Sequence, residues 1–295
     1  MQRLLAYLQL CRFAAVFTAM ADICLGYLLT HADFDSPREF GMLLGASSCL
    51  YLAGMVFNDV FDRKTDALER PKRPIPSGRA PVGAAVAFGS CLIVAGLSLS
   101  FAVGGKSATI AGLLTASIFL YDGALKSTVF GPIVMGACRF FNVMLGASTA
   151  TAVWALPQFH VAAGLGVYIA GVTWFARHEA QTSSKAQLAA AMGTINLGFA
   201  VLLGFILNWP ETPDRRMRAA LALGLIALVI NRRLFAALFD PVPAKVQGAI
   251  RTMLLWLIML DAILVFFVQE NRWYWMAVAL LMLPATFLAR FLAVT

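Results

Sequence analysis

The chain has 295 residues, of which 60% are hydrophobic and only 13% charged, and its formal net charge is +8. A soluble domain carries about 25% charged residues, so this composition excludes a soluble protein and indicates a polytopic protein of the lipid bilayer. The spans nearly fill the chain, and we expect one integral-membrane domain over residues 1–295. In so apolar a chain, orientation in the bilayer explains the positive charge better than a nucleic-acid partner, and we expect no nucleic acid.

Ten segments are candidate membrane spans, because a helix needs about 20 mostly apolar residues to cross the bilayer. The N-terminus runs directly into the first segment without a clear cleavage motif, so we expect no cleavable signal peptide. The segment 248–268 carries Arg251 and Asp261 and is the first that we would discount. In chain order the ten are 11–30, 40–59, 81–103, 107–124, 130–154, 159–176, 187–208, 218–237, 248–268 and 273–292.

The basic residues gather in alternate loops. Six of them lie between residues 60 and 80, and others follow the fourth, sixth and eighth segments. Arg215, Arg216 and Arg218 lie on the opposite side. Because cytoplasmic loops carry an excess of Lys and Arg, we expect the 60–80 loop and the N-terminus in the cytoplasm. We expect a multi-pass protein of the bacterial inner membrane with its active-site loops cytoplasmic.

The second segment ends in the sequence NDVFDRKTD, in which Asn58, Asp62 and Asp66 are spaced four residues apart. On a helix this spacing puts the three side chains on one face. Mg²⁺ takes oxygen ligands and is typically held by one or two carboxylates plus substrate phosphates, so we predict these three as metal ligands. Asp59 lies roughly 100° off this face and is predicted to be structural or to support the ligands. The alternative is a solvated helix end that happens to be acidic.

A basic loop, ALERPKRPIPSGRA, follows at once, and Arg70 and Arg73 are its predicted diphosphate-binding residues. The prolines of this loop stiffen it and fix where the arginines point, which a pure topology signal would not need. Lys126 follows Tyr121 in the sequence YDGALKS, at the same predicted end of the bundle, and could reach the same phosphates. As a lone interfacial lysine it could equally extend to the headgroups.

Further charged residues lie within or at the ends of spans. Arg139, with Asn142 close behind it, predicts a second polar face near the pocket, because an intramembrane arginine costs at least about 2.5 kcal/mol and normally faces a cavity or partner. Arg12 and Asp22 lie in the first segment, where a structural ion pair between them is an open alternative. Glu179, in ARHEA at the end of the sixth segment, is a candidate second metal ligand.

The cysteines and phenylalanines are predicted to serve mainly in packing. All five cysteines lie in apolar segments without a CxxC pair, and we interpret them as small buried hydrophobic residues. Phe57, Phe61, Phe140 and Phe141 lie in segments beside the predicted site. They could line an apolar channel and shield a carbocation, since aromatic faces attract cations, although packing alone would also explain them.

The stretch NDVFDRKTD followed by RPKRPIPSGR resembles the first aspartate-rich motif of the UbiA superfamily of intramembrane prenyltransferases. That pattern is Asn-Asp-x-x-Asp-x-x-x-Asp, then Arg-Pro-(Ile/Leu)-Pro-x-Gly. YDGALKS is similar to the tyrosine–lysine motif of the family's fourth helix, and Arg12 stands where many members have an Arg-Pro pair, with Phe13 in the proline's place. TWFARHEA and GACRFFNVMLGAS together are similar to the EboC-like branch. The resemblance covers roughly residues 5–180.

The resemblance implies an all-α membrane bundle of about nine transmembrane helices around a central, laterally open cavity. It implies Mg²⁺-dependent transfer of a prenyl chain from a prenyl diphosphate to a lipophilic or aromatic acceptor, whose identity the sequence does not encode. The predicted catalytic residues are Asn58, Asp62, Asp66, Lys126 and Glu179, of which all but Lys126 are predicted metal ligands. The predicted substrate-binding residues are Arg70, Arg73, Tyr121, Lys126 and Arg139.

The second acidic motif of the family normally supplies two or more acids after the sixth helix, whereas here Glu179 stands alone. This departure leaves open a single-metal enzyme, or a member that binds a prenyl diphosphate without transferring it. A non-catalytic membrane component that scaffolds or exports an isoprenoid-linked metabolite is therefore an alternative. A secondary transporter is disfavoured, because transporters often have broken helices at mid-membrane, whereas these charged motifs lie at span ends on one side.

Overall fold

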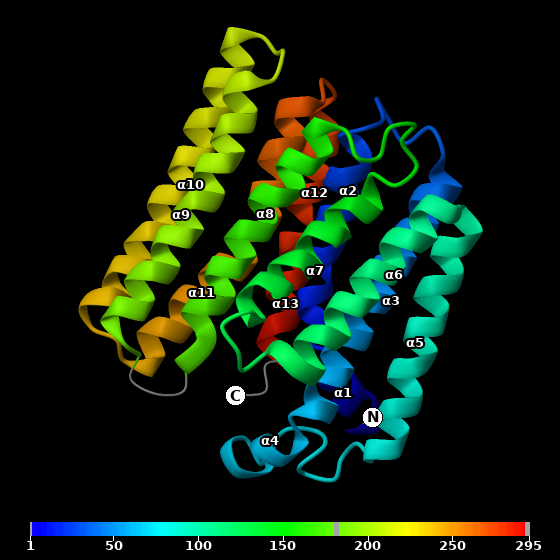
Figure 1. Cartoon of the computed structure of the whole chain (residues 1–295), viewed down its shortest axis with the longest axis vertical. Helices are drawn as coiled ribbons and strands as arrows, with labels where there is room; N and C mark the ends of the chain where they lie inside the picture. Colours follow the sequence, from blue (N-terminus) through cyan, green and yellow to red (C-terminus); the bar gives the residue numbers. More distant parts are fainter. Residues whose placement is uncertain (1, 180–182, 293–295) are drawn as a thin grey trace.

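The computed structural model describes residues 2–179 and 183–292, which form helices and turns without any strand. Figure 1 shows the helices running mostly lengthwise along the molecule. In chain order the helical elements are α1 (Gln2–Leu10), η1 (Phe13–Ala15), α2 (Val16–Leu28), α3 (Pro37–Phe61), α4 (Arg63–Glu69), α5 (Val82–Val103), α6 (Gly105–Leu120), η2 (Tyr121–Leu125), α7 (Gly131–Gly146), α8 (Leu156–Phe175), η3 (Ala176–His178), α9 (Lys185–Asn208), α10 (Pro213–Phe239), α11 (Pro243–Val268), α12 (Arg272–Leu280) and α13 (Met282–Leu292).

The predicted membrane fold is confirmed, but a count of nine spans is not. Within the described ranges, seven helices are long and apolar enough to cross a membrane, or eight when the bent pair α1–α2 counts as one. Helices α7 and α8 fall outside that set, and α7 is an apolar helix of only 16 residues. The predicted segment 130–154 was too long, because the helix ends at Gly146 and turns follow.

Helix α11 corrects our ranking of the ten segments. With 26 residues it qualifies as a span, so discounting 248–268 was wrong. Its two charged residues, Arg251 and Asp261, lie in different surroundings. Arg251 is exposed near the start of the helix, whereas Asp261 is buried against α2, where it has charged and polar neighbours.

The first predicted span, 11–30, is broken near its start. Helices α1 and α2 meet at an angle of 45°. Arg12 lies at the break with φ 46° and ψ 48°, in the left-handed region that costs a non-glycine residue roughly 1–2 kcal/mol. The chain therefore turns at Arg12 and does not continue as one straight helix.

Helix α2 packs closely against α7 because glycines face each other. A Cβ atom on Gly146 would lie 2.6 Å from the carbonyl oxygen of Ile23, and one on Gly26 would collide with the carbonyl oxygen of Val143. Small residues at helix interfaces let membrane helices approach closely. This approach brings Asp22, one turn before Gly26, to the face of α7 that carries Arg139 and Asn142.

The two ends of the bundle differ in composition. Figure 1 shows the N-terminus, α4 and the end of α8 at one end, and the connection between α9 and α10 at the other. The first end carries the acidic motif and the basic 60–80 loop. The charged motifs that the sequence predicts for one side of the bundle are therefore together in the structure.

The cysteines correct another expectation. They are free, but only Cys11 is buried, Cys91 is exposed, and Cys24, Cys49 and Cys138 are half-buried. The reason is general for membrane helices, whose lipid-facing sides are as apolar as their packed sides. An apolar sequence context therefore does not predict burial inside the protein.

Candidate functional site

The acidic motif keeps a helical path through the junction of α3 and α4. The backbone N–H of Asp62 donates to the carbonyl of Asn58 at 3.0 Å, and that of Asp66 donates to the carbonyl of Asp62 at 2.9 Å. The four-residue spacing therefore does stack these residues along one helical edge. Their side chains nevertheless reach different partners.

Asp62, at the end of α3, lines a pocket of about 480 Å³ whose other walls are η2, the turn that follows it, and η3. Its carboxylate forms an ion pair with Lys126, the lysine that the sequence predicts for the site. Arg177 contributes a second base to the wall of the pocket, and its guanidinium donates to the carbonyl of Ser127. The residues that line the pocket are Asp62, Asp122, Gly123, Ala124, Lys126, Ser127 and Arg177.

Asp122 is a pocket residue that the sequence analysis missed. The side-chain N–H of Asn58 donates to Asp122 Oδ1 at 2.6 Å, and Asn58 Oδ1 accepts from Arg12 at 3.2 Å. Asp122 lies in η2, a π-helical turn in which the N–H of Lys126 donates to the carbonyl of Tyr121. Such turns often occur at functional sites. The available signal was an acid directly after Tyr121 and four residues before Lys126.

Asp66 and Asp59 are buried beside the pocket and share one arginine. Arg73 donates to Asp66 Oδ2 at 2.6 Å and to Asp59 Oδ1 at 3.1 Å, and Arg12 also donates to Asp59 at 3.3 Å. The supporting role predicted for Asp59 agrees with these contacts. Arg73, a predicted phosphate-binding residue, is engaged in ordering the α4 loop, and the left-handed Arg12 is held by contacts with α3.

Glu179 lies apart from the carboxylates of the pocket. It accepts a hydrogen bond from Arg70 at 3.1 Å, and its backbone carbonyl accepts from Gln247 at 3.4 Å. The Arg70–Glu179 ion pair thus joins the loop between α4 and α5 (residues 70–81) to the turn that follows α8 and η3. Across residues 2–179 and 183–292, no three His, Cys, Asp or Glu side chains are grouped so that they alone could hold a metal ion.

The pocket nevertheless suits Mg²⁺ together with a phosphorylated ligand. Mg²⁺ is commonly bound through one or two carboxylates plus substrate phosphates, and Asp62 and Asp122 supply two carboxylates on one pocket. Lys126 and Arg177 provide donors suited to phosphate oxygens. The donor set on the pocket therefore fits a metal–diphosphate ligand that completes the coordination itself.

Other predicted site residues lie off this pocket. Arg139 forms an ion pair with Asp22 and donates to the backbone oxygen of Thr18 at 3.1 Å. An Arg12–Asp22 pair was therefore a wrong alternative, because the bend at Arg12 turns its side chain toward α3 while α7 supplies the partner of Asp22. Tyr121 is buried beside the pocket and is not among the residues that line it.

Of the four phenylalanines predicted beside the site, some pack on other rings and one lies next to the pocket. Phe140 packs edge to face against Phe141 and Phe159, and Phe57 packs on Phe119. Phe61 is exposed, and its ring lies 3.7 Å from where a Cβ atom on the pocket residue Gly123 would stand. Of the four predicted rings, Phe61 is therefore the one beside the pocket lining.

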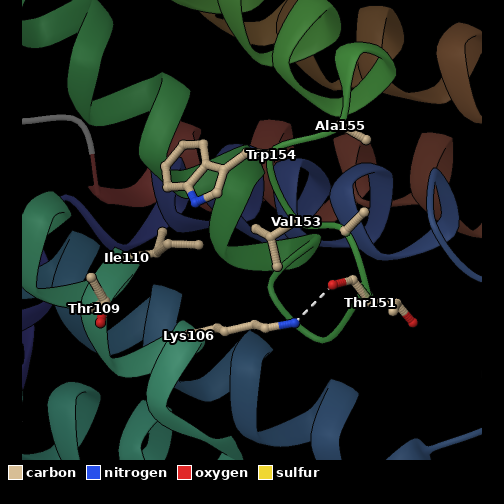
Figure 2. Close-up of a pocket in the computed structure, with 8 residues that line it drawn as sticks. Lys106, Thr109, Ile110, Thr151, Val153, Trp154 and Ala155 are labelled. Atoms are coloured by element: carbon tan, nitrogen blue, oxygen red, sulfur yellow. Dashed lines mark hydrogen bonds between the residues drawn. The ribbon is translucent and has the colours of Figure 1, made fainter.

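A second pocket, of about 540 Å³, lies between the start of α6 and the α7–α8 connection (Figure 2). Figure 1 shows both segments at the end of the bundle away from α4. Lys106 extends across it and donates to the carbonyl oxygens of Ala150 at 3.2 Å and Thr151 at 2.9 Å. Trp154 covers another side. Because its described lining contains no carboxylate, this pocket does not have the ligands for a metal–diphosphate complex.

Curated relatives share part of the sequence. The digeranylgeranylglyceryl phosphate synthase of Methanopyrus kandleri is 31% identical over 154 residues, which cover 50% of this chain and 56% of that protein. The synthase of the same name from Ignicoccus hospitalis is 26% identical over 229 residues, 77% of this chain and 71% of that protein. The chain spans about half the length of the first relatives it matches. These relatives are archaeal, so the predicted bacterial membrane stays a prediction, as does the EboC-like branch.

Solved structures share the fold. A UbiA homologue from Archaeoglobus fulgidus, bound to GPP and Mg²⁺, superimposes with a TM-score of 0.68 at 15% identity, covering 93% of this chain and 99% of that one. A UbiA homologue from Aeropyrum pernix gives a TM-score of 0.69 at 17% identity, covering 84% and 94%. A sequence model of the UbiA prenyltransferase family matches residues 16–294. This chain belongs to the UbiA prenyltransferase family.

Proposed function

We propose that this protein transfers a prenyl chain from a prenyl diphosphate to a lipophilic acceptor within the membrane, with Mg²⁺ as cofactor. The observation that carries the proposal is the pocket on which two carboxylates, Asp62 and Asp122, face two bases, Lys126 and Arg177. The Mg²⁺ and GPP bound by the Archaeoglobus fulgidus homologue support the same ligand class.

Each group on the pocket then has a defined task. Asp62 and Asp122 hold Mg²⁺, which when bound stabilises negative charge on the leaving diphosphate. Lys126 and Arg177 donate to the phosphate oxygens, so the charge that develops as the allylic C–O bond breaks meets fixed donors. Asn58 orients Asp122 through its 2.6 Å hydrogen bond. Asn58 and Asp66 stay predicted ligands, and each has a hydrogen bond with an arginine.

The prenyl chain belongs on the apolar side of the pocket. Phe61 lies beside Gly123 and is exposed on the outside of α3, where an aromatic face can attract an allylic cation. The reaction requires that water, which would otherwise quench the cation, be kept from this side of the pocket. Arg70 and Glu179 are proposed to hold two loops together beside the pocket, and the loops are proposed to face the cytoplasm.

The acceptor is proposed to be lipophilic, and the relatives' name makes a glyceryl phosphate lipid the first to test. The purified protein in lipid nanodiscs is given geranylgeranyl diphosphate, Mg²⁺, and either geranylgeranylglyceryl phosphate or a hydroxylated aromatic acid. Mass spectrometry should find a prenylated product with one acceptor, and chelation of Mg²⁺ should abolish it. Donor binding without product from either acceptor class would support the non-catalytic alternative.

A further inference from the structure

A cluster of charged side chains inside the bundle has no part in the proposed reaction. Asp22 of α2, Arg139 of α7 and Asp261 of α11 meet there, and both aspartates are 0% exposed. Asp22 forms the ion pair with Arg139, and the carboxyl group of Asp261 lies within hydrogen-bonding range of that of Asp22. Three helices far apart in the sequence thus converge on one polar centre.

The hydrogen bonds of this cluster are incomplete. Asp22 Oδ2 accepts from Arg139 and from Asn142, the latter at 2.7 Å. In contrast, Asp22 Oδ1 and both carboxyl oxygens of Asp261 receive no hydrogen bond from any donor in the described part of the chain. Two ionised carboxylates that face each other offer only acceptors. A buried acceptor without a donor costs about 1–3 kcal/mol.

The charges do not balance either. Two ionised aspartates and one guanidinium leave one negative charge in excess. The other ionisable groups that interact electrostatically with the cluster, within the described residues, are Cys24 on α2, Tyr51 on α3, Cys138 on α7 and Tyr168 on α8. Cysteine and tyrosine are ordinarily neutral at pH 7, so they do not compensate. An uncompensated charge buried in a protein is strongly destabilising.

We propose that Asp22 and Asp261 bind one proton between them at neutral pH. The proton makes one carboxyl group a donor to the other, so Asp22 Oδ1 and one oxygen of Asp261 become partners. It also leaves the cluster with one carboxylate and one guanidinium, which cancel. Two carboxyl groups that share a site cannot both ionise easily. The shared proton thereby joins α2 to α11.

Infrared spectroscopy tests this proposal directly. The carbonyl stretch of a protonated carboxyl group is separate from that of a carboxylate, and labelling with ¹³C-aspartate identifies it as aspartate. Wild type should show such a band at neutral pH, and Asp261→Asn and Asp22→Asn should each remove the same single band. The control Asp240→Asn, at an exposed residue paired with Lys245, should leave it intact. An unchanged band in both cluster variants would overturn the proposal.

Thermal unfolding adds a second readout. The proton is bound in the folded state, so raising the pH from neutral to alkaline should lower the unfolding midpoint of wild type. The midpoint of Asp261→Asn should fall less over the same pH range. A midpoint that rises with Na⁺ in wild type but not in Asp261→Asn, without the carboxyl band, would assign the site to a metal cation and overturn the proposal. If neither variant folds, the infrared spectrum of wild type still decides. Absence of the aspartic acid band from that spectrum would by itself overturn the proposal.

Discussion

In and beside the pocket, three acidic side chains are each matched with a nitrogen donor. Asp62 pairs with Lys126, Asp122 accepts from Asn58, and Asp66 pairs with Arg73. Charged hydrogen bonds of this kind fix side-chain geometry as well as supplying energy. The carboxylates and bases that would receive a metal–diphosphate complex are therefore held in place before it arrives.

Asp122 supplies a testable part of this arrangement. Asp122→Asn removes the charge but keeps an oxygen for Asn58, whereas Asp122→Ala removes both. We expect Asp122→Asn to weaken Mg²⁺-dependent binding of a prenyl diphosphate analogue about tenfold, equivalent to about 1.4 kcal/mol, and Asp122→Ala to weaken it further. Titration at several Mg²⁺ concentrations measures this. Glu69→Gln, at an exposed acid on α4, is the control, and an equal loss there would refute a specific role for Asp122.

At the scale of the elements, the Arg70–Glu179 ion pair is the contact between two loops. Both side chains are about one-third exposed, so the pair should be worth only about 0.2–1 kcal/mol. We expect Arg70→Gln and Glu179→Gln to raise the dissociation rate of the analogue by similar, less than tenfold amounts, and the double variant to add little. The exchanged pair Arg70→Glu with Glu179→Arg should restore part of the loss.

The same variants distinguish an ion pair from a metal site. If Glu179 were a ligand, Glu179→Gln would raise the Mg²⁺ concentration needed for binding, and Arg70→Gln would not. Equal effects of the two variants, independent of Mg²⁺, are the result that we expect. The structure favours this outcome because Arg70, and no pocket carboxylate, lies against Glu179.

The approach of α2 to α7 depends on small side chains. In Gly146→Ala the new methyl group would lie 2.6 Å from the carbonyl oxygen of Ile23, which is closer than packed atoms allow. Overpacking of this kind costs about 1–3 kcal/mol, so the thermal midpoint in detergent should fall. Gly112→Ala, where the added atom meets nothing within 4 Å, should not lower it. Equal midpoints for the two variants would show that α2 and α7 do not pack this way.

At the scale of the whole molecule, periodicity and hydropathy predict the features that repeat along the chain. The spacing of Asn58, Asp62 and Asp66 predicts a shared helical edge, and the loop charges predict which ends lie together. Asp122 could not be predicted in the same way, because the π-helical turn and the contact with Asn58 bring it to the pocket.

The intramembrane charges show a second limit of the sequence. By sequence alone Asp261 is only an unfavourable charge in a span, whereas the packing of α11 on α2 places it in a cluster with Asp22 and Arg139. The partner of Asp22 is likewise set by the close packing of α2 on α7, which no local pattern encodes. The number of spans also depends on backbone conformation. The left-handed conformation of Arg12 bends the chain between α1 and α2, and hydropathy does not predict this bend.

We propose that the pocket around Asp62 binds a prenyl diphosphate through Mg²⁺. The most direct test is binding of a non-reactive prenyl diphosphate analogue to the purified protein, with and without Mg²⁺, in wild type, Asp62→Asn and the control Lys106→Gln at the opposite end. Wild type and the control should bind only with Mg²⁺, and Asp62→Asn should lose at least about tenfold in affinity, or 1.4 kcal/mol. Binding by Asp62→Asn equal to wild type, or wild-type binding that needs no Mg²⁺, would contradict the claim.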